Sequence, residues 1–339
     1  MRMTKMLLCC AIAVLVATGS MLSCKKKSDQ ADSVRGAAKI VVTFAGTEAA
    51  TTGQSRMMQE VADKLNATGR FDASVQVNGA LGATDDLVAQ ARSGVPLVVP
   101  SDPGRLASQF NIPDLNILMA PYVLTDISAL QKLPGTAIFK EWQNQLEAQG
   151  ITFVADMYNG FRSFYTLTPV AKVTDLKGLR IRGFGNNIGN ALAKYLGFAN
   201  IGIPWGEVLP GLQQKTLDGC EVQVATAYGS AIFDVAKNLA LTKHYMLQSS
   251  FVCSTKLLSD MPEADRKVFL DTIQETARKY GDIVALEEST FYQQMKDKGV
   301  TITEVNISDF ENAIAPLYTN NDLGLSPGLK DRLFKELGL

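Results

Sequence analysis

The run Leu179-Arg-Ile-Arg-Gly183-Phe-Gly185-Asn-Asn-Ile-Gly189 lies near the middle of a chain of 339 residues. Its alternating residues up to Arg182 predict a short strand, its glycines predict a turn, and helical spacing follows from about Asn186. Strand and helix patterns continue to alternate on both sides of this run. The alternation predicts an α/β fold built in layers, with mainly parallel strands.

The patterns further out fit the same fold. Strands are predicted at 39–44, 73–77, 95–99, around Phe153 and at 300–305, and helices at 57–65, from Asp85 to Gly94, from Trp205 and at the chain end. After Pro262 no proline occurs until past Lys298. One helix of more than about 30 residues, bent at Gly281, is therefore expected, and its length would suit a strut between two lobes.

The glycine run invites a dinucleotide-binding interpretation. That fingerprint requires Gly-x-Gly-x-x-Gly, and this chain has one residue too many before the third glycine. No acidic residue closes a second strand at the required distance. Arg182 at the end of the strand fits an anionic ligand better.

Two arginines follow short alternating runs, Arg162 in Tyr158-Asn-Gly-Phe-Arg162 and Arg182 in Leu176-Lys-Gly-Leu-Arg-Ile-Arg182. Both should therefore lie near the edge of a sheet. A guanidinium held there can bind a carboxylate through two parallel hydrogen bonds. The alternative for either arginine is an ordinary surface ion pair.

The chain begins like an exported protein. Arg2 and Lys5 precede an apolar stretch and then small residues ending at Ser23-Cys24, which is the layout of a signal peptide of residues 1–24. The residues before Cys24 resemble a loose lipobox, so lipidation of Cys24 is expected, with plain secretion as the alternative. Residues 25–37 are predicted to be a solvated tether. The folded part would then be periplasmic, anchored to a bacterial membrane by acyl chains.

Composition excludes several classes of function. The 33 Lys and Arg residues balance 34 Asp and Glu, and no basic stripe predicts nucleic-acid binding. His244 is the only histidine, which argues against multi-histidine metal sites, and no cofactor is predicted. The sequence shows neither a nucleophile with its base nor an acid/base pair, so it does not predict an enzyme. Cys220 and Cys253 could pair, and the sequence leaves this open.

Several motifs occur together in register. They are Gly79-Ala-Leu-Gly82, Val88-Ala-Gln-Ala-Arg-Ser-Gly94, Ala120-Pro-Tyr-Val-Leu124, Gly160-Phe-Arg162, Val173 to Arg182, Ile203-Pro-Trp-Gly-Glu-Val208, Leu212-Gln-Gln214, Asp218-Gly-Cys-Glu221 and Leu241-Thr-Lys-His244. With the long helix after Pro262, they resemble the DctP-type solute-binding proteins of TRAP (tripartite ATP-independent periplasmic) transporters. The resemblance extends over essentially the whole mature chain.

The resemblance implies a fold of the periplasmic-binding-protein type with two α/β lobes, hinge strands and a long helix spanning both. Lobe I would comprise 38–158 and 248–287, and lobe II 159–247 and 288–339. It also implies pocket roles: Arg182 binds a ligand carboxylate, Arg162 assists, and Trp205 packs on the solute. Polar pocket groups of lobe I would be Thr84, Ser101 and Asp102.

Two residues depart from the family pattern. Val222 stands where an asparagine usually reaches the solute, and Phe44 occupies an often polar position after the first strand. Loss of polar partners disfavours ligand hydroxyls, because burying an unpaired hydroxyl costs about 1–3 kcal/mol. We therefore hypothesise a carboxylate ligand with an apolar body. The alternative is that both residues only change the packing.

The expected function is to capture a small organic acid and deliver it to a TRAP membrane permease. A lipoprotein scaffold that binds a partner, such as a periplasmic helical-repeat protein, is the alternative from another class. A filled, ligand-free cleft would favour the scaffold.

Overall fold

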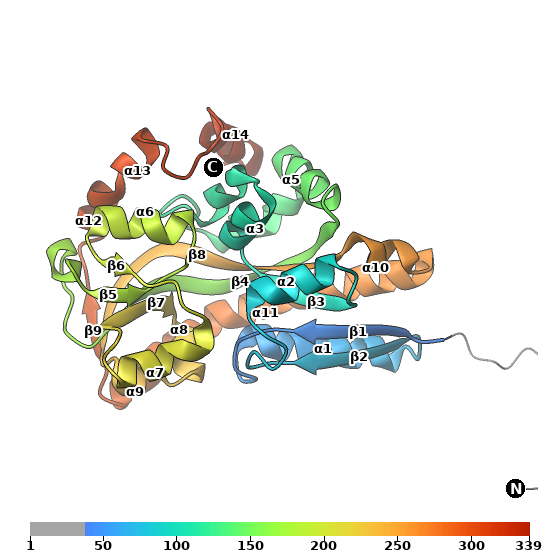
Figure 1. The fold of residues 1–339 in the computed structure, drawn as a ribbon, viewed down its shortest axis with the longest axis horizontal. Helices are drawn as coiled ribbons and strands as arrows, with labels where there is room; N and C mark the ends of the chain where they lie inside the picture. The colour runs from blue at the N-terminus through green and yellow to red at the C-terminus, as the bar shows by residue number, and fades with distance from the viewer. Residues whose placement is uncertain (1–37) are drawn as a thin grey trace, which may run out of the picture. The chain divides into compact units, whose positions relative to one another are not determined.

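One mixed β-sheet forms the centre of the described part of the chain, residues 38–339 of this computed structural model (Figure 1). The strand order is β2-β1-β3-β8-β4-β7-β5-β6, and β9 pairs with β8 outside this path. The strands are β1 Ile40–Ala45, β2 Phe71–Gln76, β3 Leu97–Ser101, β4 Ile151–Thr166, β5 Arg180–Arg182, β6 Ala199–Asn200, β7 Gly219–Gln223, β8 Asn238–Ser254 and β9 Thr301–Glu304. The predicted signal peptide, the lipidation site Cys24 and the tether lie outside the described residues.

The two ends of the sheet are parallel, as the alternating pattern predicts, but the middle is antiparallel. β1 pairs in parallel with β2 and β3, and β5 pairs in parallel with β6 and β7. Between these groups β4 and β8, of 16 and 17 residues, run antiparallel to each other. Both long strands extend from one parallel group to the other, so each group with its helices forms a lobe, and the lobes share these two strands.

The helices cover both faces of the sheet and carry the apolar stripes that the spacing predicts. They are α1 Gly53–Ala67, α2 Thr84–Arg92, α3 Pro103–Phe110, α4 Ile127–Lys132, α5 Ala137–Glu147, α6 Asn187–Leu196, α7 Val208–Gln213, α8 Val224–Gly229, α9 Ile232–Val235, α10 Thr255–Asp260, α11 Glu263–Asp297, α12 Ile307–Ile314, α13 Pro316–Thr319 and α14 Leu329–Leu337, with the 3-10 turns η1 Pro113–Met119, η2 Leu133–Gly135, η3 Val173–Leu176 and η4 Trp205–Glu207. Within the described residues, no helix has both the length and the apolar character needed to cross a membrane.

The long helix expected after Pro262 is α11, which has 35 residues. It packs along β4 and α1. Gly281 lets it approach the sheet closely, since a Cβ there would lie 3.4 Å from the backbone nitrogen of Tyr158. Further along, the Tyr158 hydroxyl donates to Glu288 at 2.7 Å. The helix therefore fastens to β4 at the point where that strand passes between the lobes.

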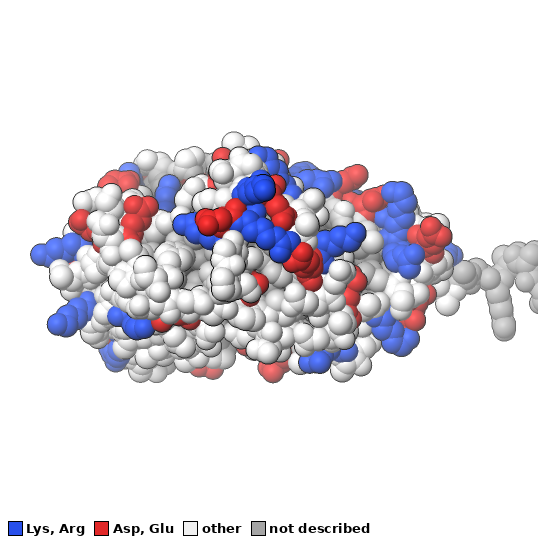
Figure 2. Space-filling model, turned by 90° about the horizontal axis from the view of Figure 1, so that it is seen from above, with Lys and Arg blue, Asp and Glu red and all other residues white. Residues whose placement is uncertain are grey.

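The C-terminal segment returns to helices of the first half of the chain. Arg332 of α14 pairs with Glu141 of α5 at 2.5 Å, and Lys194 of α6 pairs with Asp322 at 2.7 Å. Charges of both signs are also mixed on the face shown in Figure 2, where blue and red side chains lie side by side. Cys220 and Cys253 are both buried free thiols.

Candidate functional site

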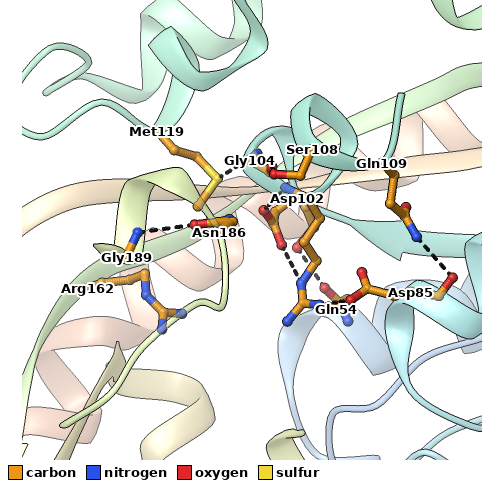
Figure 3. Close-up of polar contacts among 12 residues, drawn as sticks. Gln54, Asp85, Asp102, Gly104, Ser108, Gln109, Met119, Arg162, Asn186 and Gly189 are labelled. Carbon is orange, nitrogen blue, oxygen red and sulfur yellow. Dashed lines mark hydrogen bonds and ion pairs between the residues drawn. The ribbon is translucent and has the colours of Figure 1, made fainter. Parts of the chain in front are cut away.

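A cleft of about 680 Å³ opens between the two lobes, and residues of both line it. Of the predicted site residues, those that line it are Arg182, Arg162, Trp205, Val222, Ser101, Asp102 and Thr84. Figure 3 shows Arg162 and Asn186 on one side of this region and Gln54, Asp85 and Asp102 on the other. Strand ends and helix starts from distant parts of the sequence therefore meet here.

Phe44 is not among the lining residues. It is fully buried on β1, on the same side of the strand as Val42, and belongs to the hydrophobic core. One of the two departures from the family pattern thus affects packing below the cleft rather than its surface. Val222 on β7 does line the cleft, although its side chain is almost fully covered.

Arg182 is a buried cation without an anion. It ends β5, where the carboxyl ends of parallel strands face the cleft, and only 3% of it is exposed. Its Nε donates to the carbonyl of Ile203 at 3.2 Å, and among the described residues no carboxylate pairs with it. Burial, and then the nearby charge of Arg162, lower its pKa to about 10. An uncompensated buried charge is costly, so the missing counter-charge sets Arg182 apart from the other buried groups of the cleft.

Arg162, in contrast, already has its carboxylate. Its Nη2 donates to Oε1 of Glu221 at 2.8 Å, its Nε donates to Oε2 of the same residue, and Nη1 donates to Gln223 at 3.1 Å. Burial alone would lower the pKa of Arg162, but Glu221 raises it above its ordinary value. This pair links β4 to β7 beneath the cleft.

Glu221 also organises the polar groups below Arg162. The hydroxyl of Tyr245 donates to its Oε2 at 3.3 Å, and Nε2 of His244 lies 3.4 Å from the same oxygen. Burial lowers the pKa of His244. His244 is fully buried and stacks on Phe164, so it belongs to the floor of the site and does not line the cleft.

Phe184 separates the three arginines of the site. Its ring centre lies 4.4 Å from Cζ of Arg162, 5.2 Å from that of Arg105 and 5.7 Å from that of Arg182. Trp205 is a second aromatic neighbour of Arg182, with its ring centre 5.4 Å from Cζ. The aromatic faces favour the cations electrostatically and fix the plane of each guanidinium.

The rim on lobe I is closed by a separate ion pair. Arg105 of α3 contacts Asp102 at 3.0 Å and Asp85 at 3.0 Å. Asp102 also caps α3, since its Oδ1 accepts from the backbone N–H of Arg105 at 2.9 Å. Arg105 therefore contacts both carboxylates, and neither of them forms an ion pair with Arg182.

Polar atoms without partners surround the cleft. The Oε1 atom of Glu48 accepts from Asn159 at 3.2 Å, Gln223 at 3.1 Å and Thr226 at 2.9 Å, whereas its Oε2 has no partner among the described residues. Burial raises the pKa of Glu48. Ser101 Oγ and Asn186 Nδ2 are likewise buried without a partner. Buried polar groups are normally hydrogen-bonded, so these atoms have hydrogen-bonding capacity that the described residues leave unused.

Sequence reasoning missed several lining residues. Glu48, Gln54, Arg105, Phe184 and Asn186 all line the cleft. The first three have no local pattern that marks them. Asn186 was predicted only as a helix start, and it does cap α6 by accepting from Gly189 at 3.1 Å.

Two acidic residues of the sequence motifs lie in different places. Asp218 does not line the cleft and forms an ion pair with Arg180, with 2.7 Å between the two side chains. Glu207 lines the cleft. Tyr158 does not line this cleft, and its hydroxyl binds Glu288 of the long helix instead.

The lobes touch where α3 meets α6. A Cβ placed on Gly104 would lie 2.8 Å from Nδ2 of Asn186 and 2.8 Å from Cδ1 of Ile188. At such distances the side chain of Asn186 or Ile188 would have to shift. The absence of a side chain at residue 104 therefore leaves room for these two side chains at the contact between the lobes.

Comparisons with known proteins agree with this geometry. The family model described as bacterial extracellular solute-binding protein, family 7 (DctP) matches residues 43–322. The C4-dicarboxylate-binding periplasmic protein DctP of Rhodobacter capsulatus is 26% identical over 290 residues, which cover 82% of this chain and 85% of that protein.

Two solved structures that are similar to this chain differ in whether a ligand is bound. A TRAP periplasmic solute-binding protein of Actinobacillus succinogenes 130z, with bound L-galactonate, has a TM-score of 0.83 at 26% identity and covers 88% of this chain and 99% of its own. An apo open structure from Escherichia fergusonii has a TM-score of 0.73 at 25% identity, covering 86% and 98%. Of these two structures, the ligand-bound one is therefore the more similar to this chain in the arrangement of its backbone.

Proposed function

This chain belongs to family 7 of the bacterial extracellular solute-binding proteins, the DctP type of TRAP transporters, and we propose that it captures a small organic carboxylate in the cleft between its lobes. It is a binding protein and not an enzyme. The observation that carries the proposal is Arg182, a buried guanidinium in the cleft with no carboxylate partner among the described residues. A ligand carboxylate supplies the missing charge.

The energy available from such contacts is sufficient. Each hydrogen bond to a charged group contributes about 1.5–3 kcal/mol. Two bonds to Arg182, together with buried apolar surface, approach the roughly 8 kcal/mol of a micromolar site. Arg162 contributes by stacking on Phe184 and by fixing the site beneath it, because its own hydrogen bonds go to Glu221 and Gln223.

The part of the ligand next to the carboxylate is proposed to be apolar. Trp205, Phe184 and Val222 line the cleft on the same lobe as Arg182. Further away, Glu48 Oε2 and Ser101 Oγ need partners, so a hydrogen-bond donor at the other end of the ligand would complete the site. The relatives named above include proteins that bind a C4-dicarboxylate and L-galactonate, so this chain would differ from them in the middle of the ligand.

A calorimetric titration with matched acids tests this proposal. The panel comprises a branched acid (isovalerate), an aromatic acid (phenylacetate), a dicarboxylate (succinate) and a sugar acid (L-galactonate). We expect binding of an acid with an apolar segment to exceed that of L-galactonate. Tight binding of L-galactonate with none of the branched or aromatic acids would reject the apolar segment, and binding of none of the acids would reject the carboxylate.

Delivery to a TRAP permease completes the proposed function. Ligand contacts made only when the lobes are closed would shift the protein towards the closed state, which the permease then recognises. We further propose that acylated Cys24 anchors the protein in the periplasm, as the sequence before it predicts. Incorporation of labelled palmitate into the expressed full chain, and its loss in Cys24→Ser, would test the anchor.

A further inference from the structure

A second cavity, of about 380 Å³, lies in lobe I away from the ligand cleft. Its walls come from α4, α5, α10, α11 and the first half of β4. The two cavities use different parts of β4: residues 152–156 and Tyr158 line this one, whereas Asn159 and Arg162 line the cleft. Its volume falls in the range of small-molecule sites, at roughly 300–1,000 Å³.

The lining combines apolar side chains with several polar ones, among which Asp156, Glu147 and Arg278 carry charges. Leu130, Phe139, Phe153 and Leu270 are among the side chains that form the walls. Asp156 lies among them on β4, partly buried. Apolar walls with a small number of polar groups are the usual arrangement of a site that binds a small molecule in a fixed orientation.

The carboxylate of Asp156 is only half satisfied. Its Oδ1 accepts from Ser250 Oγ at 2.6 Å and from Gln248 Nε2 at 2.9 Å. Its Oδ2 receives no hydrogen bond, and no Lys or Arg pairs with Asp156, among the described residues. Burial raises the pKa of Asp156 to about 6, so it is mainly ionised at pH 7 and above. A carboxylate in apolar surroundings without a cation has a strong electrostatic need for one.

The other charged groups of the cavity favour a cation as well. Glu147 and Arg278 also line it, so two acidic residues stand against one basic residue. Arg278 is exposed on α11, whereas Asp156 is partly buried on the strand. An anionic ligand would meet the deep carboxylate and be repelled.

We propose that this cavity is a second binding site, which takes a small organic cation: an ammonium group on a compact apolar body. The ammonium binds Oδ2 of Asp156, and the apolar body packs against Leu130, Phe139 and Leu270. The site is separate from the proposed carboxylate cleft, so either could fail without the other.

Titration with three probes of the same shape tests the proposal. They are the amine cyclohexylmethylamine, the alcohol cyclohexylmethanol and the acid cyclohexanecarboxylate. Using Arg182→Ala protein at pH 7.5 prevents the acid from binding in the cleft. We expect saturable binding of the amine, at least about ten-fold weaker binding of the alcohol, and none of the acid.

Two variants on the same background locate the binding. Asp156→Asn keeps a carbonyl oxygen for Ser250 and Gln248, so the fold is retained, and it should weaken the amine about ten-fold or more. Asp271→Asn makes the same chemical change on the exposed side of α11 and should leave binding unchanged. Amine affinity should also fall as the pH drops through about 6, where Asp156 becomes protonated.

The outcomes are decisive in either direction. Absence of saturable amine binding, equal binding of amine and acid, or unchanged affinity in Asp156→Asn would overturn the proposal. The NMR signals of backbone amides that line the cavity, such as that of Ala155, should shift when the amine is added to the parent protein. They should not shift when it is added to Asp156→Asn.

Discussion

The two arginines of the cleft differ in what surrounds them. Arg162 lies against Glu221, which receives its hydrogen bonds, and the pair joins β4 to β7. Arg182 lies on the neighbouring strand β5, equally buried, with a backbone carbonyl as its hydrogen-bond acceptor. Burial of an arginine therefore does not by itself indicate a ligand site. The distinguishing feature is whether the protein supplies the counter-charge.

Breaking the internal pair should have the largest effect on stability. Glu221→Gln keeps the shape of the side chain but leaves Arg162 buried without a carboxylate, and we expect a loss of about 3–5 kcal/mol in the free energy of unfolding. Urea denaturation at pH 7 measures it. Asp218→Asn, which affects the exposed Arg180–Asp218 pair, is the matched control and should change stability little. Equal effects of the two variants would contradict the structural role of Arg162.

The same pair predicts how stability depends on pH. Burial alone would raise the pKa of Glu221, but Arg162 and His244 hold it at about 2, against 4.5 for an ordinary glutamate. A lowered folded-state pKa gives a contribution that is complete above pH 4.5 and is lost as pH falls towards about 2. The difference in stability between wild type and Glu221→Gln should therefore narrow over this range. A constant difference from pH 7 to pH 3 would refute it.

Removing the unpaired arginine should affect binding and spare the fold. Arg182→Ala is expected to lose about 2–5 kcal/mol of ligand binding free energy. Its stability without ligand should stay the same or rise, because an uncompensated buried charge is removed. Calorimetry with the best acid of the panel, and urea denaturation of the same samples, separate the two effects. If Arg182→Ala lost stability but bound the acid with unchanged affinity, the roles assigned to the two arginines would be reversed.

Closure of the lobes can be tested at Gly104. In Gly104→Ala the new Cβ would come too close to Asn186 and Ile188 in the present arrangement of the lobes, and accommodating it should destabilise this arrangement by about 1–3 kcal/mol. Small-angle X-ray scattering should then show a less compact protein with ligand, and affinity should fall. Gly135→Ala, where a Cβ would meet nothing within 4 Å, is the control. A fall in affinity without a change in compactness would point to local distortion.

The smallest effect is expected at Arg180, two residues before Arg182 on the same strand. Arg180 is exposed and pairs with Asp218 at 2.7 Å. Arg180→Ala should leave ligand affinity within error of wild type, because its charge is screened and satisfied at the surface. A large loss of affinity would show that general positive potential, and not the position of Arg182, attracts the ligand.

The sequence predicts the features that depend on local patterns. The helix after Pro262, the strand at 179–182 and the helix start at Asn186 follow from spacing and capping, and they occur in α11, β5 and α6. The antiparallel centre of the sheet could not be predicted in this way. β4 and β8 are buried along almost their whole length, so they lack the alternation that marks a strand.

The residues of the site also fall into those that local sequence motifs predict and those that they do not. Arg182 and Trp205 belong to recognisable motifs, and both line the cleft. The partner of Arg162 is 59 positions away in the sequence, and no local signal connects the two. For the same reason the hydrogen bonds of Glu48, to residues more than 100 positions away, could not be foreseen.

Native mass spectrometry tests the central idea, capture of an organic acid by Arg182, most directly. Wild type, Arg180→Ala and Arg182→Ala would be purified in parallel from the same culture medium and sprayed without denaturation. We predict an adduct with the mass of a small organic acid on wild type and Arg180→Ala, and bare protein for Arg182→Ala. The same adduct on Arg182→Ala, at the same occupancy, would contradict the account.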